Sequence, residues 1–295
     1  MIGHTAALLV VFAAASGCGT SPPAPAAADA ASALPADASS ADAEAEDDAA
    51  QQWKATLTAS DAVDLFYSQG VARIPDGWIF SAAGALWRTD DAFVQLAERD
   101  VPLPGELTAL GFNHIGGIDF AEGMLYAAVE QHDFSRNEQA VVRFDPQTLD
   151  YVDHVLLAQH EASFMAVDEP TMTAYLSDRY SDDTLLRYDI KAGWKPLASL
   201  PMSQKVEHIQ GGDIAQGAIW LSCDDPVQGI YRVDLASGAV VQVGSVNRQE
   251  KVGDFRPEVE GIDASQLSSG LLHVLTGEPL KLTSWLDHFE VAAPN

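Results

Sequence analysis

Histidine and acidic side chains recur at matching positions along this chain, and together they could bind a metal ion or move a proton. Imidazole and carboxylate groups suit zinc, manganese or iron, whereas carboxylate and carbonyl oxygens suit calcium. A histidine beside a carboxylate could also work as a general acid or base without a metal. A third reading is a hydrated polar surface with no chemistry. The residues concerned are His114, Glu130, His208, Glu258 and Glu260.

Two repeated motifs indicate how the chain could bring these residues together. The first motif is an arginine, any residue and an aspartate at the end of an apolar run. It recurs at intervals of 44 to 55 residues, as Arg88-Thr89-Asp90, Arg143-Phe144-Asp145, Arg187-Tyr188-Asp189, Arg232-Val233-Asp234 and the degenerate Trp285-Leu286-Asp287. We expect each of these aspartates to cap the following turn through its side chain.

The second motif precedes each copy of the first and consists of a small residue, an apolar residue and an aspartate. Its copies are Gly117-Ile118-Asp119, Ala166-Val167-Asp168, Gly211-Gly212-Asp213 and Gly261-Ile262-Asp263, with Gly70-Val71-Ala72 as a degenerate first copy. Two motifs that share one period predict repeats of four short strands, which is the unit of a β-propeller. The predicted fold is all-β, with five four-stranded antiparallel blades; six blades is the alternative.

The predicted strands of the second repeat cover residues 115–120, 124–130, 140–144 and 151–158. The last repeat lacks an outer strand, and residues 53–58 (WKATLT) have no blade of their own. This segment could pair into the last blade and close the ring, which would remove exposed strand edges. The six-bladed alternative would instead build a divergent blade partly from residues 53–70.

A propeller of this kind would gather its polar residues at one mouth of a central channel. The inner strand of each blade starts at the mouth where the antiparallel second strand ends, and such loops often carry sites. Counting along the repeats places the five candidate metal ligands there, together with Tyr67, Asp178 and Asp224 as ligand-contacting residues. The prediction depends on the register, because a slip of one residue would turn each side chain to the other face.

Composition excludes some functions. The net charge is −27, from 16 basic and 43 acidic residues, so the protein should not seek nucleic acid or anionic lipid. The sequence has no nucleotide-binding glycine loop, no Gly-x-Ser-x-Gly and no His-Glu-x-x-His. Without a disulfide partner, Cys223 should be buried, and His273 inside an apolar strand should be a core histidine.

The N-terminal residues have the pattern of an export signal. Residues 6–15 form an apolar run too short to span a bilayer, which is typical of a signal peptide. The run ends in Ala15-Ser16-Gly17-Cys18, which resembles the bacterial lipobox, where the cysteine takes acyl chains such as palmitate. This resemblance implies a signal peptide at 1–17 and a lipid anchor at Cys18; a plain secretory signal is the alternative. By the same resemblance, Gly19 favours the outer membrane of the cell envelope.

The segment 18–50 is rich in alanine, proline, serine and acid, so it should be a disordered tether, and residues 51–295 should form the propeller. Residues 70–90 and 114–130 resemble blades of olfactomedin domains, propeller-type glutaminyl cyclases and the calcium-dependent lactonase and gluconolactonase superfamily. The lactonase resemblance implies a cation held by carboxylates at the channel mouth, with Glu258 and Glu260 as the nearest matches.

Two functions remain open from the sequence. One is a monomeric, envelope-anchored module that binds a small molecule or a protein through its channel mouth. The alternative is a metal-dependent hydrolase acting on lactones or esters, with calcium or zinc as its cofactor.

Overall fold

Short apolar runs punctuated by tight turns give each repeat its four strands. In the second repeat these are β6 (Phe112–Ala121), β7 (Met124–Gln131), β8 (Gln139–Phe144) and β9 (Tyr151–Leu157). They match the predicted segments to within three residues at each end. The turn from β6 to β7 needs two positive φ angles, which Glu122 (+50°) and Gly123 (+75°) supply.

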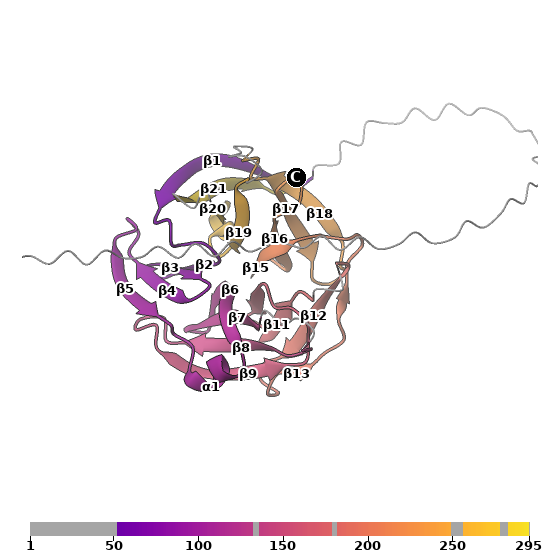
Figure 1. Cartoon of the computed structure of the whole chain (residues 1–295). Helices are drawn as coiled ribbons and strands as arrows, with labels where there is room; N and C mark the ends of the chain where they lie inside the picture. Colours follow the sequence, from indigo (N-terminus) through magenta and orange to yellow (C-terminus); the bar gives the residue numbers. More distant parts are fainter. Residues whose placement is uncertain (1–51, 132–135, 179–181, 249–255, 278–282, 295) are drawn as a thin grey trace, which may run out of the picture. The chain divides into compact units, whose positions relative to one another are not determined.

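The computed structural model describes residues 52–131, 136–178, 182–248, 256–277 and 283–294, and these form a five-bladed β-propeller (Figure 1). Each blade is a four-stranded antiparallel sheet, so the predicted fold is confirmed and the six-bladed alternative is wrong. Within the described ranges, no helix is both long enough and apolar enough to cross a bilayer.

The remaining blades follow the same order from the axis outward. Blade 1 contains β2 (Val71–Ile74), β3 (Gly77–Ala82), β4 (Ala85–Thr89) and β5 (Gln95–Asp100). Blade 3 contains β10 (Met165–Asp168), β11 (Thr173–Leu176), β12 (Thr184–Asp189) and an outer strand split into β13 (Lys195–Pro196) and β14 (Leu200–Pro201). Blade 4 contains β15 (Ile209–Ala215), β16 (Ala218–Cys223), β17 (Gly229–Asp234) and β18 (Val240–Ser245).

Blade 5 joins the two ends of the described chain. It contains β19 (Glu258–Asp263), β20 (Leu271–Gly277) and β21 (Ser284–Ala292), with β1 (Lys54–Val63) as its outer strand. Strand β1 runs antiparallel to β21, which confirms that the N-terminal segment closes the ring. A short helix α1 (Gly105–Ala109) precedes β6, and the 3₁₀ turn η1 (Leu267–Ser269) links β19 to β20.

The closing strand is fixed by a fully buried carboxylate. Asp287 accepts hydrogen bonds from Ser60 Oγ on β1 (2.5 Å), from Arg248 Nη2 (2.6 Å) and from Thr276 Oγ1 (3.0 Å). A buried carboxylate needs such partners, because an unpaired charge in the interior is costly. In the degenerate fifth copy of the arginine–aspartate motif, Asp287 on β21 therefore joins this strand to β1 and β20 through its side chain.

The other four copies of this motif cap turns, as predicted. Asp145 Oδ1 accepts hydrogen bonds from the backbone N–H groups of Gln147 (2.8 Å) and Thr148 (2.9 Å). Equivalent bonds to the backbone of the following turn are made by Asp90, Asp189 and Asp234.

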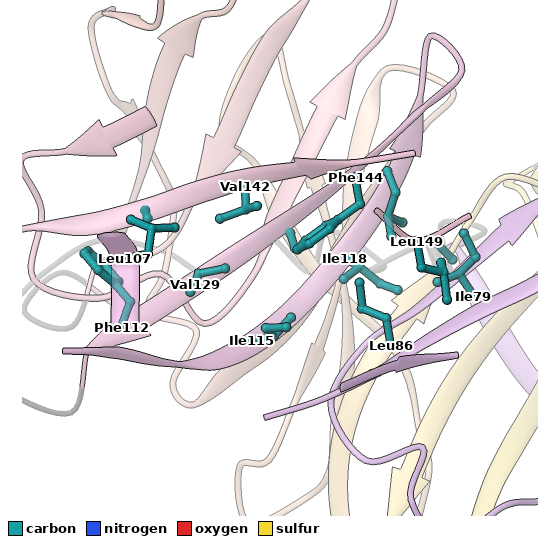
Figure 2. Close-up of a cluster of buried hydrophobic side chains, with 14 of the residues drawn as sticks. Ile79, Leu86, Leu107, Phe112, Ile115, Ile118, Val129, Val142, Phe144 and Leu149 are labelled. Atoms are coloured by element: carbon teal, nitrogen blue, oxygen red, sulfur yellow. The ribbon is translucent and has the colours of Figure 1, made fainter. Parts of the chain in front are cut away.

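The apolar core lies between the blades. In the part of the chain that the structure describes, five clusters of buried side chains each join two neighbouring blades. Figure 2 shows the cluster in which Ile79 and Leu86 of blade 1 face Ile118, Val142 and Phe144 of blade 2. Each blade is therefore stabilised by both of its neighbours.

Small residues in the inner strands let neighbouring blades meet at the axis. A Cβ added to Gly261 would lie 2.6 Å from Val71 N and 2.8 Å from Gly70 Cα, closer than real contacts allow. At the same motif position in blade 2, a Cβ on Gly117 would lie 2.9 Å from Phe164 Cβ. The small position of the second motif is thus required by close packing of the inner strands.

Candidate ligand-binding site

Three aspartates from the second motif join neighbouring inner strands near the axis. Each ends its inner strand or lies near that end, and each accepts a hydrogen bond from a backbone N–H of the next blade. We name them the hub aspartates; the pairs are Asp119 with Val167 (2.7 Å), Asp213 with Ala264 (2.5 Å) and Asp263 with Arg73 (2.6 Å).

The hub aspartates hold protons more tightly than ordinary carboxyl groups do. Burial raises the pKa of Asp119 to about 7, and the charge of Asp263 adds to the shift. Burial also raises the pKa of Asp213 and of Asp263 above the usual range, and Asp119 and Asp263 add to the shift of Asp213. Like charges that share a poorly solvated site disfavour full ionisation. A cation placed among them would therefore be attracted strongly.

The hub aspartates line a cavity of about 770 Å³, which we name the hub cavity. It lies at the end of the ring where the inner strands finish and turn into the second strands. Further charged and polar lining comes from Arg73, Asp168, Glu169, Gln216, Ser265 and Gln266. Its volume falls within the range of small-molecule sites, about 300 to 1,000 Å³. In the described part of the chain, its lining thus carries five carboxyl groups and one guanidinium.

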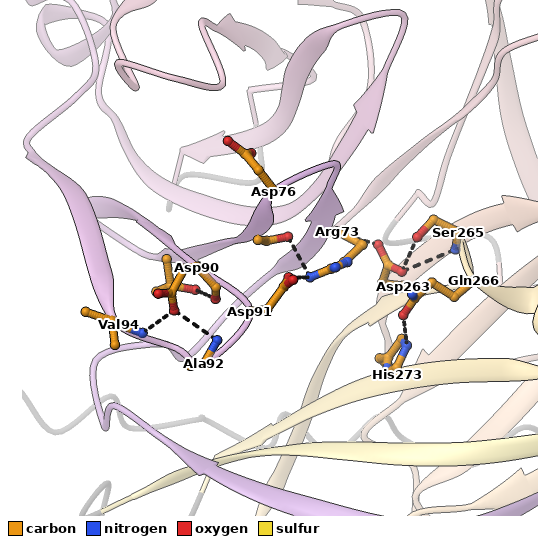
Figure 3. A network of polar contacts seen from close by, with 12 residues as sticks. Arg73, Asp76, Asp90, Asp91, Ala92, Val94, Asp263, Ser265, Gln266 and His273 are labelled. Carbon is orange, nitrogen blue, oxygen red and sulfur yellow. Dashed lines mark hydrogen bonds and ion pairs between the residues drawn. The ribbon is translucent and has the colours of Figure 1, made fainter.

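The guanidinium of Arg73 is already engaged away from the hub. Its Nη1 donates to Gly77 O (3.1 Å) and to Asp91 Oδ1 (2.5 Å), and the group stacks over Trp78 at 4.8 Å from the ring centroid. Figure 3 shows this contact beside Asp263, whose Oδ1 accepts from Ser265 Oγ at 2.7 Å. Arg73 therefore pairs with Asp91, although its charge also opposes the raised pKa of Asp263. The five carboxyl groups of the cavity still outnumber this single guanidinium.

The mouth predicted from the sequence lies at the opposite end of the inner strands. There His114 and Glu130 are cross-strand partners on β6 and β7, with His114 Nδ1 3.8 Å from Glu130 Oε2. His114 Nε2 is 2.7 Å from Gln69 Oε1, and Glu130 Oε1 accepts from Ala162 N at 2.8 Å. The Glu130 carboxylate therefore joins blade 2 to blade 3, as Asp119 does at the other end.

Two other predicted residues share a separate cavity at that end. Asp178 and His208 both line a space of about 390 Å³, together with Glu161, Asp182 and Glu207. His208 is exposed and has a positive φ of +54°.

The predicted residues near β19 form another group. Nη2 of Arg256, a residue that no sequence motif marks, lies 3.2 Å from Asp224 Oδ2. Burial raises the pKa of Asp224, and the guanidinium of Arg256 opposes that shift. Glu258 is exposed, whereas Glu260 is buried.

Tyr67 lies in the core between blades 5 and 1 rather than at a surface. It is 3% exposed and stacks on Phe80 with ring centroids 4.3 Å apart. Burial raises the pKa of its hydroxyl to about 12.

Three other expectations have different outcomes. Cys223 is fully buried and unpaired, as predicted. His273 is a buried histidine with hydrogen bonds at both ring nitrogens, also as predicted. Cys18 lies outside the described residues. Among described residues, no group of three or more histidine, cysteine or acidic side chains has an arrangement that could hold a metal ion.

The hub aspartates were visible in the sequence only as repeat markers. Their signal was an acidic residue at the end of an apolar run in several repeats, a position where burial of the side chain is expected. The spacing of the repeats predicts a site at the other end of the same strands instead.

The fold and the cavity together define a five-bladed β-propeller protein with an acidic cavity at one end of its ring. No family model matches the sequence, and no curated protein is significantly similar to it.

Solved structures with a similar fold include a luciferin-regenerating enzyme, with 10% sequence identity, a TM-score of 0.46 and 75% of each chain covered. Another is the PQQ-bound aldose sugar dehydrogenase from Streptomyces coelicolor, with 12% identity, a TM-score of 0.46, and 82% of this chain and 99% of the other covered. A third is the Pan2 WD40 domain of Neurospora crassa, with 9% identity, a TM-score of 0.37, and 74% and 62% covered. Similarities this low do not bear on function.

Proposed function

We propose that this propeller is a binding module that takes a small molecule bearing an ammonium or guanidinium group in the hub cavity. The observation that carries the proposal is a space of about 770 Å³ lined by five carboxyl groups, three of them buried. Rigid inner strands position these groups, which favours a preformed site. The site lies at the end of the ring opposite to the mouth predicted from the sequence.

The charge balance of the cavity favours a cationic ligand. Because burial raises the pKa of the hub aspartates, a bound ammonium group would replace a proton and pair with the released carboxylate. Asp168 and Glu169 add acidic groups at the rim, where they would steer a cation inward. Binding should therefore release protons near neutral pH.

Calorimetric titration tests this proposal with putrescine and agmatine as probes and 1,4-butanediol as a neutral control. We expect both amines to bind to the purified protein and the diol to show no heat. The paired change Asp168→Asn with Glu169→Gln should weaken binding at least several-fold while the fold is retained. The matched control, Asp178→Asn at the other end of the ring, should leave affinity unchanged. Equal heats for the amines and the diol would refute the proposal.

The metal-dependent hydrolase remains the competing function. It requires a divalent ion such as calcium or zinc at His114, Glu130, His208, Glu258 or Glu260. Elemental analysis of the purified protein separates the two functions. A stoichiometric metal in the wild type that is lost in the double variant H114A/H208A would support the hydrolase and count against the amine-binding module.

We also propose that the protein is held at the cell envelope through a lipid on Cys18, after removal of residues 1–17. The motif Ala15-Ser16-Gly17-Cys18 supports this anchoring. Membrane fractionation and mass spectrometry of the mature N-terminus test it. The wild type should sediment with membranes and carry acyl chains, and C18S should carry none. An unmodified Cys18 in the mature wild type would rule the anchor out.

A further inference from the structure

A row of four hydrogen-bonded side chains connects the closing strand to the hub cavity. Asp61 on β1 lies 2.9 Å (Oδ2) from His288 Nε2 on β21. His288 Nδ1 is 2.7 Å from His273 Nδ1 on β20, and His273 Nε2 is 2.9 Å from Gln266 Oε1. Gln266 is one of the residues that line the hub cavity. Figure 3 shows the end of this row, where His273 meets Gln266 beside Asp263.

The donors and acceptors of the row fix where its protons lie. Gln266 Oε1 can only accept, so His273 Nε2 donates to it. His273 Nδ1 then has no proton, and the proton between the two Nδ1 atoms belongs to His288. The carboxylate of Asp61 also accepts, so His288 Nε2 donates as well. In this arrangement His288 is an imidazolium ion and His273 is neutral.

The surroundings of His273 disfavour a positive charge on its ring. His273 is 3% exposed and contacts Trp78 edge to face at 5.0 Å. Burial, followed by the positive charges of His288 and Arg73, lowers the pKa of His273 to about 3. His288 faces the largely exposed carboxylate of Asp61, and Glu290 follows two positions later on the same strand. Histidine is the side chain that in general exchanges a proton near neutral pH, so pH is the variable with which to test the row.

We propose that the proton on His288 sets which end of the Gln266 carboxamide is presented to the hub cavity. The inference rests on the binding role proposed for that cavity. On deprotonation of the pair, the Nδ1 proton of His288 passes to Nδ1 of His273, and His288 keeps Nε2–H for Asp61. The proton on His273 Nε2 is released to solvent, which leaves His273 as the Nδ1–H tautomer. His273 Nε2 then accepts, and Gln266 must rotate its carboxamide to donate Nε2–H.

The rotation changes the chemistry of the cavity wall. In the protonated state Oε1 of Gln266 is bound to His273, and its Nε2 has no partner among the described residues. In the deprotonated state the carbonyl oxygen is released instead. An ammonium ligand is a donor, so it is favoured by a carbonyl and disfavoured by an NH₂ group. The row thus makes Gln266 a specificity-determining residue whose preference for cations increases with pH.

The first test needs no ligand. Nitrogen-15 NMR of the imidazole rings distinguishes the Nε2–H from the Nδ1–H tautomer in the whole mature protein. We expect His273 to be the Nε2–H tautomer at pH 5 and the Nδ1–H tautomer at pH 8.5. The same tautomer at both pH values would overturn the switch, whatever the cavity binds.

The second test links the row to binding. Putrescine affinity is measured by calorimetry at pH 5.5 and pH 8 for the wild type, for Gln266→Leu and for His154→Gln. His154 is a matched control, because it also lies beside a carboxylate, Glu106 at 3.6 Å, but on β9. We expect Gln266→Leu to reduce the ratio of the two affinities several-fold and His154→Gln to leave it unchanged.

The outcomes separate the two proposals. If Gln266→Leu kept the wild-type ratio, the coupling of the row to the cavity would be overturned while the binding role stood. If putrescine bound at neither pH, the proposed binding role and the effect on affinity would both be refuted. The NMR result would still decide whether His273 and Gln266 change state.

Discussion

Asp263 of the last blade accepts a hydrogen bond at 2.6 Å from the backbone N–H of Arg73 in the first blade. The ring is therefore closed both near its axis and at its outer edge. At the hub, this carboxylate holds β2 to β19. At the outer edge, β1 pairs along its length with β21. The chain ends that are farthest apart in sequence are thus joined twice, by different kinds of contact.

The outer closure should depend strongly on Asp287. In Asp287→Ala the guanidinium of Arg248 would lose its carboxylate, and Ser60 and Thr276 would lose their acceptor. Removing one partner of a buried ion pair costs about 3 to 5 kcal/mol. Urea unfolding of Asp145→Ala, at the equivalent motif position, should show a loss of only about 1 kcal/mol. Similar losses of unfolding free energy in the two variants would contradict the role of Asp287 in holding β1.

The tight packing of the inner strands predicts a sharp contrast between two glycines. Gly261→Ala would bring a methyl group to 2.6 Å from backbone N of Val71, so the inner strands would have to separate. Overpacking of this kind costs about 1 to 3 kcal/mol. Gly84→Ala is the control, since nothing lies within 4 Å of its added Cβ. Thermal unfolding should show a clear decrease for the first variant and none for the second.

Because the hub aspartates have raised pKa values, we predict that the free energy of unfolding decreases as pH rises. The pKa of Asp119 is about 7 in the folded protein and 3.8 for an ordinary aspartate, so between these pH values the folded state keeps a proton that the unfolded chain has released. Stability from this group is complete below about pH 4 and is lost through pH 7. Roughly three pKa units at about 1.4 kcal/mol each set an upper limit of about 4 kcal/mol.

Asp119→Asn tests this pH dependence, because an amide oxygen can still accept from Val167 N without taking a charge. Chemical unfolding from pH 4 to pH 8 should show a flatter stability profile than the wild type, with a gain at pH 8. Asp145→Asn is the comparison. Backbone N–H groups of Thr148 and Gln147 lower the pKa of Asp145, so its contribution has the opposite sign and is lost on acidification. A wild-type slope in Asp119→Asn would contradict the assignment.

Cys223 should be unreactive until the fold opens. Its side chain is fully buried, and burial raises the pKa of its thiol, so little thiolate is available for reaction. In a C18S background, a chromogenic disulfide reagent should react slowly with the native protein and rapidly in denaturant. Fast labelling under native conditions would show that the packing between blades 3 and 4 opens readily.

The fold could be predicted because its constraints are local and repeated. The turn-capping Asp145 and the close-packed Gly117 each serve one blade in a way that recurs in the others, so both left periodic marks in the sequence. The pairing of β1 with β21 was also predictable, since an unpaired strand and an incomplete repeat imply one another.

The site was harder to predict because it depends on contacts between blades. Asp119 and Glu130 occupy opposite ends of one blade, and both accept a backbone N–H from blade 3. The sequence alone could not show which end of the ring holds the larger cavity, because the cavity is formed by hairpins from several blades. The partnership of Asp224 with Arg256 was hidden for the same reason, because their sequence separation of 32 residues matches no repeat spacing.

The placement of β1 in the last blade also governs when this protein can finish folding. A chain synthesised from its N-terminus presents β1 early, yet its only strand partner, among the described residues, is near the C-terminus. Any product that stops short of β21 would leave β1 with an unsatisfied edge and blade 5 without its rim. Incomplete chains would therefore be open to proteolysis, so the topology itself distinguishes finished copies from unfinished ones.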